Sequence, residues 1–149
     1  MQLAKHIGAR VITTASAANH DYLRELGADQ IIDYRTQDFT QVVTDVDAVF
    51  DTVGGREVVD GSFAVLRPGG RAAFIASGQT APVPARDDVV SLRPKVGRGR
   101  AHLERIAELV TSGAVRVPEI KVYPLSEAAE AHKVSEGRHL RGKLVFKVR

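Results

Sequence analysis

The segment 47-DAVFDTVGGREVVDGSFAVLRPGGRAAFIASG-78 decides the fold, because it reads as a strand, a turn, a helix, a second turn and a second strand. The first strand is the short apolar run 48–50, which is followed by Asp51 and the turn-forming glycines 54–55. Such a run is typical of a strand that is buried on both faces of a parallel sheet. The second strand covers 71–77, in which residues 72–76 are all apolar.

Between these strands, apolar side chains recur at the spacing of a helix, at Val59, Phe63 and Leu66. Gly61 lies within this helix and costs about 1 kcal/mol relative to alanine. The Pro-Gly-Gly sequence at 68–70 ends the helix. Two strands that are joined by a helix lie parallel, with a right-handed crossover. The segment therefore predicts half of a nucleotide-binding sheet.

The sequence on either side continues the alternation of strands and helices. We expect further strands at 10–14, 30–33, 120–122 and 144–146, and a short apolar run at 89–92 within a loop over 79–100. We expect helices at 1–6, from Ser16 or Asn19 to Leu26, from near Thr36 through Val43, at 103–110, and from Ser126 toward Gly137. This order predicts one α/β domain over 1–149, with a mainly parallel sheet and helices on both faces.

Composition excludes several classes of protein. The chain has 149 residues, of which 44% are hydrophobic and 26% are charged, as in a globular domain. No apolar run approaches the ~18 residues that cross a bilayer, and the first residues lack a secretion signal. We therefore expect no membrane partner and a cytoplasmic location. Cysteine is absent, which excludes disulfides and thiolate zinc sites within the chain.

The net charge of +3 raises the question of nucleic-acid binding. Basic residues gather between Arg93 and Arg105 and near the C-terminal end. However, tryptophan is absent and aromatic residues make up only 5% of the chain, so no stacking platform accompanies the charge. We expect no nucleic-acid partner, and interpret the charge as solvated surface or attraction for the phosphates of a small ligand.

Neither the histidines nor the carboxylates form a recognisable catalytic or metal-binding motif. The histidines show no metal-ligand spacing, so we expect no metal site. They are His6, His20, His102, His132 and His139. Asp47 and Asp51 flank the strand 48–50, where they suit strand boundaries, a turn cap or a ribose contact better than paired acid and base catalysis. We assign no catalytic residue.

Ligands of open α/β sheets bind at the carboxyl ends of the strands, so the residues after each strand form the candidate site. These residues are small or polar: Ser16, Thr52, Val53, Ala76, Ser77 and Gly78. A domain that binds NAD usually has Asp or Glu at 15–18, after the strand 10–14, to bind the ribose hydroxyls; none stands there, which favours NADP. Ser16 also suits the N-cap of a helix, and the two roles can coexist.

Several segments together resemble the medium-chain dehydrogenase/reductase superfamily, and in particular its quinone oxidoreductase-like branch. The segments are RVITTAS, LRELGADQIIDYR, DAVFDTVGG, LRPGGRAAFIASG, YPLSEAAEAH and RGKLVF. The resemblance implies a Rossmann-like domain that binds NADPH as a small-molecule cofactor. In such proteins a GroES-like catalytic domain comes first, and a strand with a glycine-rich turn opens the Rossmann domain. The sequence contains neither that domain nor that loop.

The resemblance also implies roles for individual residues. Ser16 and Tyr34 match positions that line the pocket for the 2′-phosphate of adenosine. Thr52 and Val53 match the turn beneath the cofactor's ribose, and residues 76–78 match the segment near the nicotinamide. Asn19 departs from the pattern, because relatives that hold the phosphate firmly often have lysine there. Zinc ligands and substrate contacts, where the family has them, lie largely outside the matched segments.

The implied chemistry is hydride transfer from NADPH to an enone or quinone. Because the sequence contains only the cofactor-binding half of that apparatus, we expect a truncated or mis-started chain, or an excised cofactor domain. Such a chain would have little activity alone. In the strand order 3-2-1-4-5-6 of this fold, the absent strand is the central one. The strands at Arg10 and Asp47 then lose the neighbour that they would share. We expect these two strands to pair directly, or a second copy of the chain to fill the gap and form a homodimer.

Two other interpretations remain open at this stage. A methyltransferase also has a strand that ends in Asp and a turn like LRPGG, although its glycine-rich first loop and the acid after its second strand are absent here. A nucleotide-sensing or dimerising module would keep the scaffold without catalysis. Binding of S-adenosylmethionine, or tight NADPH binding without turnover, would distinguish these two.

Overall fold

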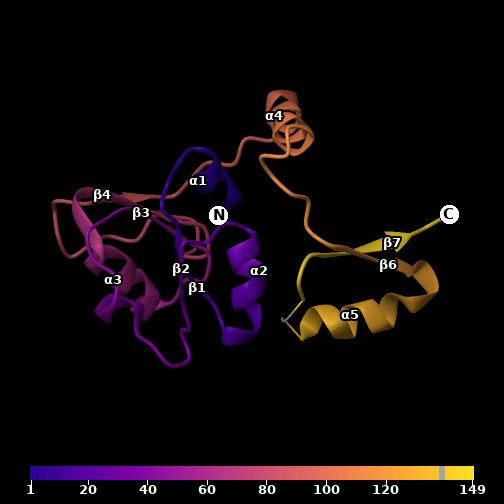
Figure 1. The fold of residues 1–149 in the computed structure, drawn as a ribbon, viewed down its shortest axis with the longest axis horizontal. Coiled ribbons are helices and arrows are strands. Elements are labelled where there is room, and N and C mark those ends of the chain that lie inside the picture. The colour runs from indigo at the N-terminus through magenta and orange to yellow at the C-terminus, as the bar shows by residue number, and fades with distance from the viewer. Residues whose placement is uncertain (138–139) are drawn as a thin grey trace. The chain divides into compact units, whose positions relative to one another are not determined.

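The computed structural model describes residues 1–137 and 140–149. His139, one of the histidines considered for metal binding, lies outside the described residues. The chain forms two compact units, one built from Met1 and Leu3–Leu103 and the other from Gln2 and Glu104–Arg149. Figure 1 shows the order of their elements.

The first unit contains two parallel sheets. The shorter sheet pairs β1 (Ile12–Thr14) with β2 (Gln30–Ile32), and the other has the order β3 (Val46–Asp51), β4 (Leu66–Phe74) and β5 (Val90–Leu92). The helices are α1 (Gln2–His6), α2 (His20–Glu25) and α3 (Arg56–Ala64), with 3-10 helices η1 (Ala17–Asn19) and η2 (Phe39–Gln41). Helix α3 connects β3 to β4, as the decisive segment predicts. The α/β fold with parallel strands is confirmed.

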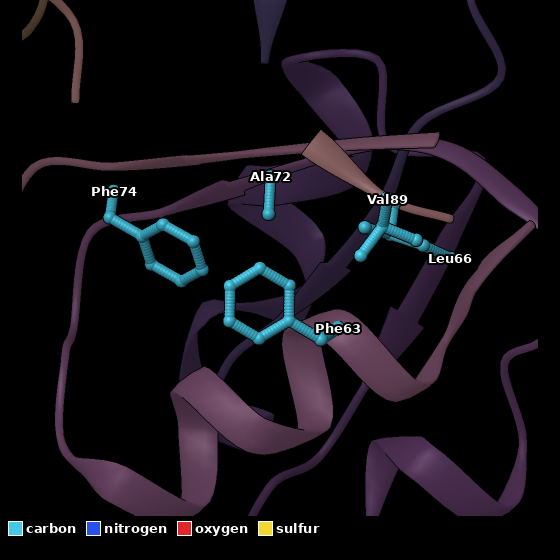
Figure 2. Packing of buried hydrophobic residues seen from close by; sticks show 5 residues of the cluster. All are labelled: Phe63, Leu66, Ala72, Phe74 and Val89. Atoms are coloured by element: carbon cyan, nitrogen blue, oxygen red, sulfur yellow. The ribbon is translucent and has the colours of Figure 1, made fainter. Parts of the chain in front are cut away.

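The main hydrophobic cluster joins α3 to the sheet of β4. Ala72 and Phe74 are fully buried, because alternate residues of a strand share one face. Phe63 of α3 packs against Phe74 with ring centroids 5.1 Å apart and planes tilted by 56°. Figure 2 shows the Phe63 ring pointing toward Phe74 and Ala72, with Leu66 and Val89 beside them. This packing fixes α3 on the sheet.

A second cluster lies between the two sheets. Its buried members are Ile32 from β2, Val43 after η2 and Val65 after α3. Gly61 contributes to this packing, since a Cβ atom there would lie 2.6 Å from Cζ of Phe39. The expected cost of a glycine within α3 is therefore offset by the close approach of η2.

Two local predictions about this unit are wrong. The helix expected from near Thr36 is only the single turn η2, because the Asp38 side chain accepts a hydrogen bond from the backbone N–H of Thr40 at 2.9 Å and caps a tight turn. The helix expected to reach the Pro-Gly-Gly sequence ends at Ala64 instead. Residues 68–70 fall inside β4, where a shift in register and the positive φ of Gly69 (76°) accommodate them.

The prediction that residues 48–50 are buried on both faces is also wrong. Ala48 is exposed, and Phe50 is 64% exposed. The physical reason is that, among the described residues, β3 pairs only with β4, so its other edge has no neighbouring strand to cover it. The expected direct pairing of the strands near Arg10 and Asp47 is wrong for the same reason, since β1 and β3 belong to separate sheets.

The second unit is a strand, helix and strand crossover. Strands β6 (Ile120–Pro124) and β7 (Lys143–Lys147) pair in parallel, and α5 (Ala128–Glu136) and the 3-10 turn η3 (Leu125–Glu127) connect them. Helix α4 (Arg100–Thr111) precedes them, and its residues span the boundary between the units. Ser126 makes no capping hydrogen bond to α5, because η3 intervenes. In the described part of the chain, no helix has the length and apolar character that a bilayer crossing requires.

Candidate functional site

Strands β1 and β3 both line a cleft of about 250 Å³ in the first unit. Its walls include Ile12 and Thr14 from β1, and Ala48 and Phe50 from β3. The second hydrophobic cluster contributes further apolar side chains, including Ile32. All of the lining residues lie in the described part of the chain, and Asp51 is the only ionisable side chain among them. The cleft therefore combines apolar side chains with the hydroxyl-bearing Thr13, Thr14, Thr52 and Ser62 and with one carboxylate at the end of β3.

Asp51 shapes the turn that follows β3. Its side chain is buried with the residue only 4% exposed, and Oδ1 accepts hydrogen bonds from the backbone N–H groups of Val53 at 2.8 Å and Gly54 at 3.0 Å. The interpretation of Asp51 as a turn cap is confirmed. Its second oxygen, Oδ2, is buried and has no hydrogen-bond partner among the described residues. A donor brought by a ligand or another segment would satisfy this atom.

The turns after β3 and β4 are in contact. A Cβ atom at Gly54 would lie 3.0 Å from the carbonyl oxygen of Ala76, and Gly54 has a φ of 74°. Only glycine suits both the backbone conformation and the close approach. The contact brings the exposed Thr52 and Val53 into the same region as residues 76–78. Ser77 adds a buried hydroxyl, Oγ, that has no partner among the described residues.

Ser16 and Tyr34 lie at the carboxyl ends of the other sheet, β1 and β2. Ser16 stands at the N-cap of η1, but its side chain makes no capping bond; its hydroxyl accepts instead from Nδ2 of Asn19 at 3.4 Å. Tyr34 is 57% exposed, with the Arg35 guanidinium carbon 6.0 Å from the centre of its ring. Both side chains can therefore reach a ligand in solvent.

The site residues named from the sequence thus fall into two groups. One group follows β1 and β2, and the other follows β3 and β4. Thr52 and Val53 line the cleft, whereas Ser16, Tyr34 and residues 76–78 do not. Sequence reasoning did not include Thr14 and Phe50, which also line it. No sequence signal identifies Thr14 and Phe50 as lining residues, because their position in the cleft depends on β1 and β3 lying in separate sheets.

The opposite, amino-terminal ends of β1 and β2 are joined by polar contacts. Lys5 Nζ donates to Asp29 at 2.8 and 2.9 Å, and the backbone N–H of Val11 donates to Asp29 Oδ2 at 2.6 Å. The hydrogen bond from Lys5, and then that from Val11, lower the pKa of the Asp29 carboxyl below its ordinary value of 3.8. These contacts have a structural role and lie away from the strand ends that carry the candidate site.

We looked for side chains that could together bind a metal ion. Within residues 1–137 and 140–149, no three His, Cys, Asp or Glu side chains gather closely enough to hold a metal ion. Cysteine, the residue that supplies thiolate ligands to zinc, does not occur in the sequence. The residues described here do not fit a zinc site.

Known proteins match almost the whole chain. It is 33% identical to a 2-haloacrylate reductase of Burkholderia sp over 96% of its length, and 30% identical to the chloroplastic NADPH-dependent alkenal/one oxidoreductase of Arabidopsis thaliana over 97%. Those alignments cover 49% and 36% of the relatives. The structure of a quinone oxidoreductase from Coxiella burnetii matches 99% of the chain with a TM-score of 0.78 and 37% identity, over 48% of its own length.

The chain therefore spans half or less of the length of these relatives. The model of a protein family described as zinc-binding dehydrogenase matches residues 26–146. That match includes the turns after β2, β3 and β4 and most of the second unit. The relatives and the fold agree with it, and they confirm the resemblance inferred from the sequence. The chain belongs to the zinc-binding dehydrogenase family.

Proposed function

We propose that this chain is the NADPH-binding part of an oxidoreductase that reduces an enone or a quinone. The observation that carries the proposal is the contact between the turns after β3 and β4, where the backbone of Gly54 meets Ala76. Two small-residue turns that meet at the carboxyl edge of parallel strands suit the close approach of a dinucleotide. The names of the Arabidopsis and Coxiella proteins support the substrate class.

The preference for NADP over NAD rests on the residues after β1 and β2. No acidic residue stands at 15–18 to accept hydrogen bonds from ribose hydroxyls. Ser16 and Tyr34 instead offer hydroxyl groups at the ends of adjacent strands, and Asn19 holds the Ser16 hydroxyl through its amide. We propose that these groups bind the 2′-phosphate of the adenosine ribose.

Bound NADPH would supply the hydride, and the chain would supply binding and orientation. The residues fit this cofactor at two points. The backbone of Gly54 meets that of Ala76, which brings the two small-residue turns together, and the buried Ser77 Oγ has no hydrogen-bond partner among the described residues. We propose that Thr52 and Val53 hold the ribose and that residues 76–78 orient the nicotinamide. We assign no zinc ligand to this chain, because its described side chains do not fit a zinc site.

Cofactor binding can be measured by calorimetric titration of the chain with NADPH, NADH and S-adenosylmethionine. We expect saturable binding of NADPH and weaker binding of NADH. Ser16→Ala should weaken NADPH binding at least about tenfold, because a hydrogen bond to a charged group contributes ~1.5–3 kcal/mol, and should leave NADH binding unchanged. The matched control is Ser126→Ala, an exposed serine of the second unit. Saturable binding of S-adenosylmethionine without NADPH binding would contradict the proposal in favour of a methyltransferase.

Turnover by this chain alone would also require residues that contact the substrate. The residues described here bind and orient a cofactor, and we assign none of them to contact with the substrate. We therefore propose little turnover without further protein. The assay is oxidation of NADPH at 340 nm with a quinone or an enone as acceptor. Turnover by the purified 149-residue chain would contradict this part of the proposal, whereas binding without turnover would support it.

A further inference from the structure

Arg93 follows β5 at the carboxyl end of the three-stranded sheet, and the neighbouring strand holds its side chain there. Its Nη1 donates a hydrogen bond to the backbone carbonyl of Phe74, the last residue of β4, at 2.7 Å. Phe74 lies opposite Asp51 of β3 in the sheet. The guanidinium of Arg93 is therefore fixed at the strand end from which residues 76–78 continue.

The register of the sheet explains why a side chain makes this bond. Strands β4 and β5 pair with Ala73 opposite Leu92, so Phe74 comes opposite Arg93. A regular parallel ladder would supply the carbonyl of Phe74 with the N–H of residue 94. Residue 94 is a proline, which has no N–H. The Arg93 guanidinium donates in its place.

Arg93 differs from another arginine of the first unit that binds backbone carbonyls. Arg86 donates to the carbonyls of Phe63 and Leu66, at 3.3 and 2.9 Å, and its charge is paired with Asp88. The half-buried Arg93 forms no ion pair with a carboxylate in the described part of the chain, and its Nε–H and Nη2–H groups make no hydrogen bond there. These two groups form one edge of the planar guanidinium, which suits a carboxylate.

Unsatisfied hydroxyls and positive charge surround this part of the sheet. Ser77 Oγ, after β4, and Ser91 Oγ, on β5, are buried and have no partner among the described residues. Buried polar atoms of this kind require a partner that a bound ligand or a water can bring. Lys95 and Arg98 are exposed in the segment that follows Arg93, and they add positive charge. The end of β5 therefore suits an anionic ligand.

The proposed nicotinamide segment, residues 76–78, lies close to this free edge of the guanidinium. The carbonyl that Arg93 contacts belongs to Phe74, two residues before Ala76, or about 7 Å along an extended chain. A molecule that is reduced beside residues 76–78 can therefore reach Arg93 with a group that is attached directly to its double bond. A carboxylate in that position would receive both free N–H groups.

We propose that the Nε–H and Nη2–H groups of Arg93 bind the carboxylate of the substrate, and that the substrate is an α,β-unsaturated acid. This inference rests on the proposed function, since it concerns the molecule that is reduced. It assigns a charged substrate where the proposed function names enones and quinones. Arg93 determines specificity because a neutral ketone would leave its charge unpaired. The rival ligand is a neutral carboxamide, such as that of nicotinamide.

The probes are crotonate and crotonamide, which have nearly the same shape and differ in charge. NMR of the full, nitrogen-15-labelled chain follows the Nε–H signal of Arg93, both without cofactor and with NADP⁺, which carries no hydride. We expect crotonate to shift this signal saturably in both states, because the carbonyl of Phe74 already holds the guanidinium. Crotonamide should bind at least about tenfold more weakly, since a hydrogen bond to a charged group is the stronger. Equal binding of the two probes, or no shift with crotonate, would overturn the inference.

Arg93→Lys keeps the positive charge and a donor for the carbonyl of Phe74, but it removes the second N–H of the planar edge. We expect this variant to bind crotonate at least about tenfold more weakly, as followed by the backbone amides of residues 76–78. The matched control is Lys95→Gln, which removes a charge from the same segment and should leave crotonate binding unchanged. Equal losses in the two variants would overturn the inference, because they would show a general attraction between basic residues and an anion.

Calorimetric titration with NADP⁺ separates this inference from the proposed function. Saturable NADP⁺ binding without a crotonate shift at Arg93 would overturn the inference and leave the proposed function in place. A crotonate shift in a chain that does not bind NADP⁺ would overturn the proposed function, and with it the identification of the carboxylate as part of a substrate.

Discussion

Replacement of Phe74 by alanine provides the most direct test of how the first unit is held together. Phe74 is fully buried, and its ring lies 5.1 Å from the ring of Phe63 on α3. Truncation of a buried phenylalanine costs about 3–5 kcal/mol, of which the aromatic pair accounts for roughly 0.5–1.5 kcal/mol. A domain is stable by only about 5–15 kcal/mol, so this variant should lose a large part of its stability.

The chain offers a matched control one strand away. Phe50 lies on β3 opposite Ala73 of β4, beside the pair of Asp51 with Phe74. Because Phe50 is 64% exposed, Phe50→Ala should change the free energy of unfolding by no more than about 0.5 kcal/mol. The two substitutions remove the same atoms from neighbouring strands, so burial is the main difference between them.

Urea unfolding, followed by far-UV circular dichroism, measures both variants. With a slope of about 2 kcal/mol per molar urea, Phe74→Ala should lower the midpoint by roughly 2 M and Phe50→Ala by less than about 0.3 M. If Phe74→Ala is unfolded in buffer, Phe74→Leu retains part of the packing and gives a measurable midpoint. Equal losses at the two positions would refute the reasoning, because they would mean that β3 is as covered in solution as β4.

Two further perturbations test the turns and the strand ends. Asp29→Asn should flatten the fall in melting temperature as the pH drops below 3.8. The lowered pKa of Asp29 means that its stabilising contacts with Lys5 are fully present above the ordinary value of 3.8 and are lost as the pH falls through the lower folded-state value. An equally steep fall in both proteins would contradict this. Gly54→Ala should lower the urea midpoint more than Gly8→Ala does. Both glycines have positive φ, at a cost of about 1–2 kcal/mol for alanine, but only at Gly54 would the new methyl group approach Ala76, whereas nothing lies within 4 Å at Gly8. Equal effects would show that the two turns are not in contact.

Local sequence patterns predicted the core of the first unit. The apolar run before Asp51 and the helical spacing of Val59 and Phe63 identified β3 and α3, because each pattern follows from the geometry of one element. The same reasoning failed at Phe39 and Val43, which have helical spacing but follow Asp38. The carboxylate of Asp38 offers the backbone a competing hydrogen bond, and this shortens the helix to one turn.

Those local patterns did not predict contacts between segments that are distant in the sequence. The approach of Gly54 to Ala76 depends on how the chain returns through α3 and β4. A Gly-Gly turn looks the same with or without such a contact. The exposure of Phe50 likewise depends on β1 and β3 lying in separate sheets, which no local pattern reveals. Sequence therefore predicted which residues follow the strands, but not which of them meet.

The separation of β1 and β3 into different sheets connects these observations. Among the described residues β3 pairs with β4 alone, and Phe50 on β3 stays exposed. The separation also divides the proposed cofactor site, since Ser16 and Tyr34 follow one sheet and Thr52 and Val53 follow the other. Under the proposed function, one NADPH molecule would therefore contact both sheets.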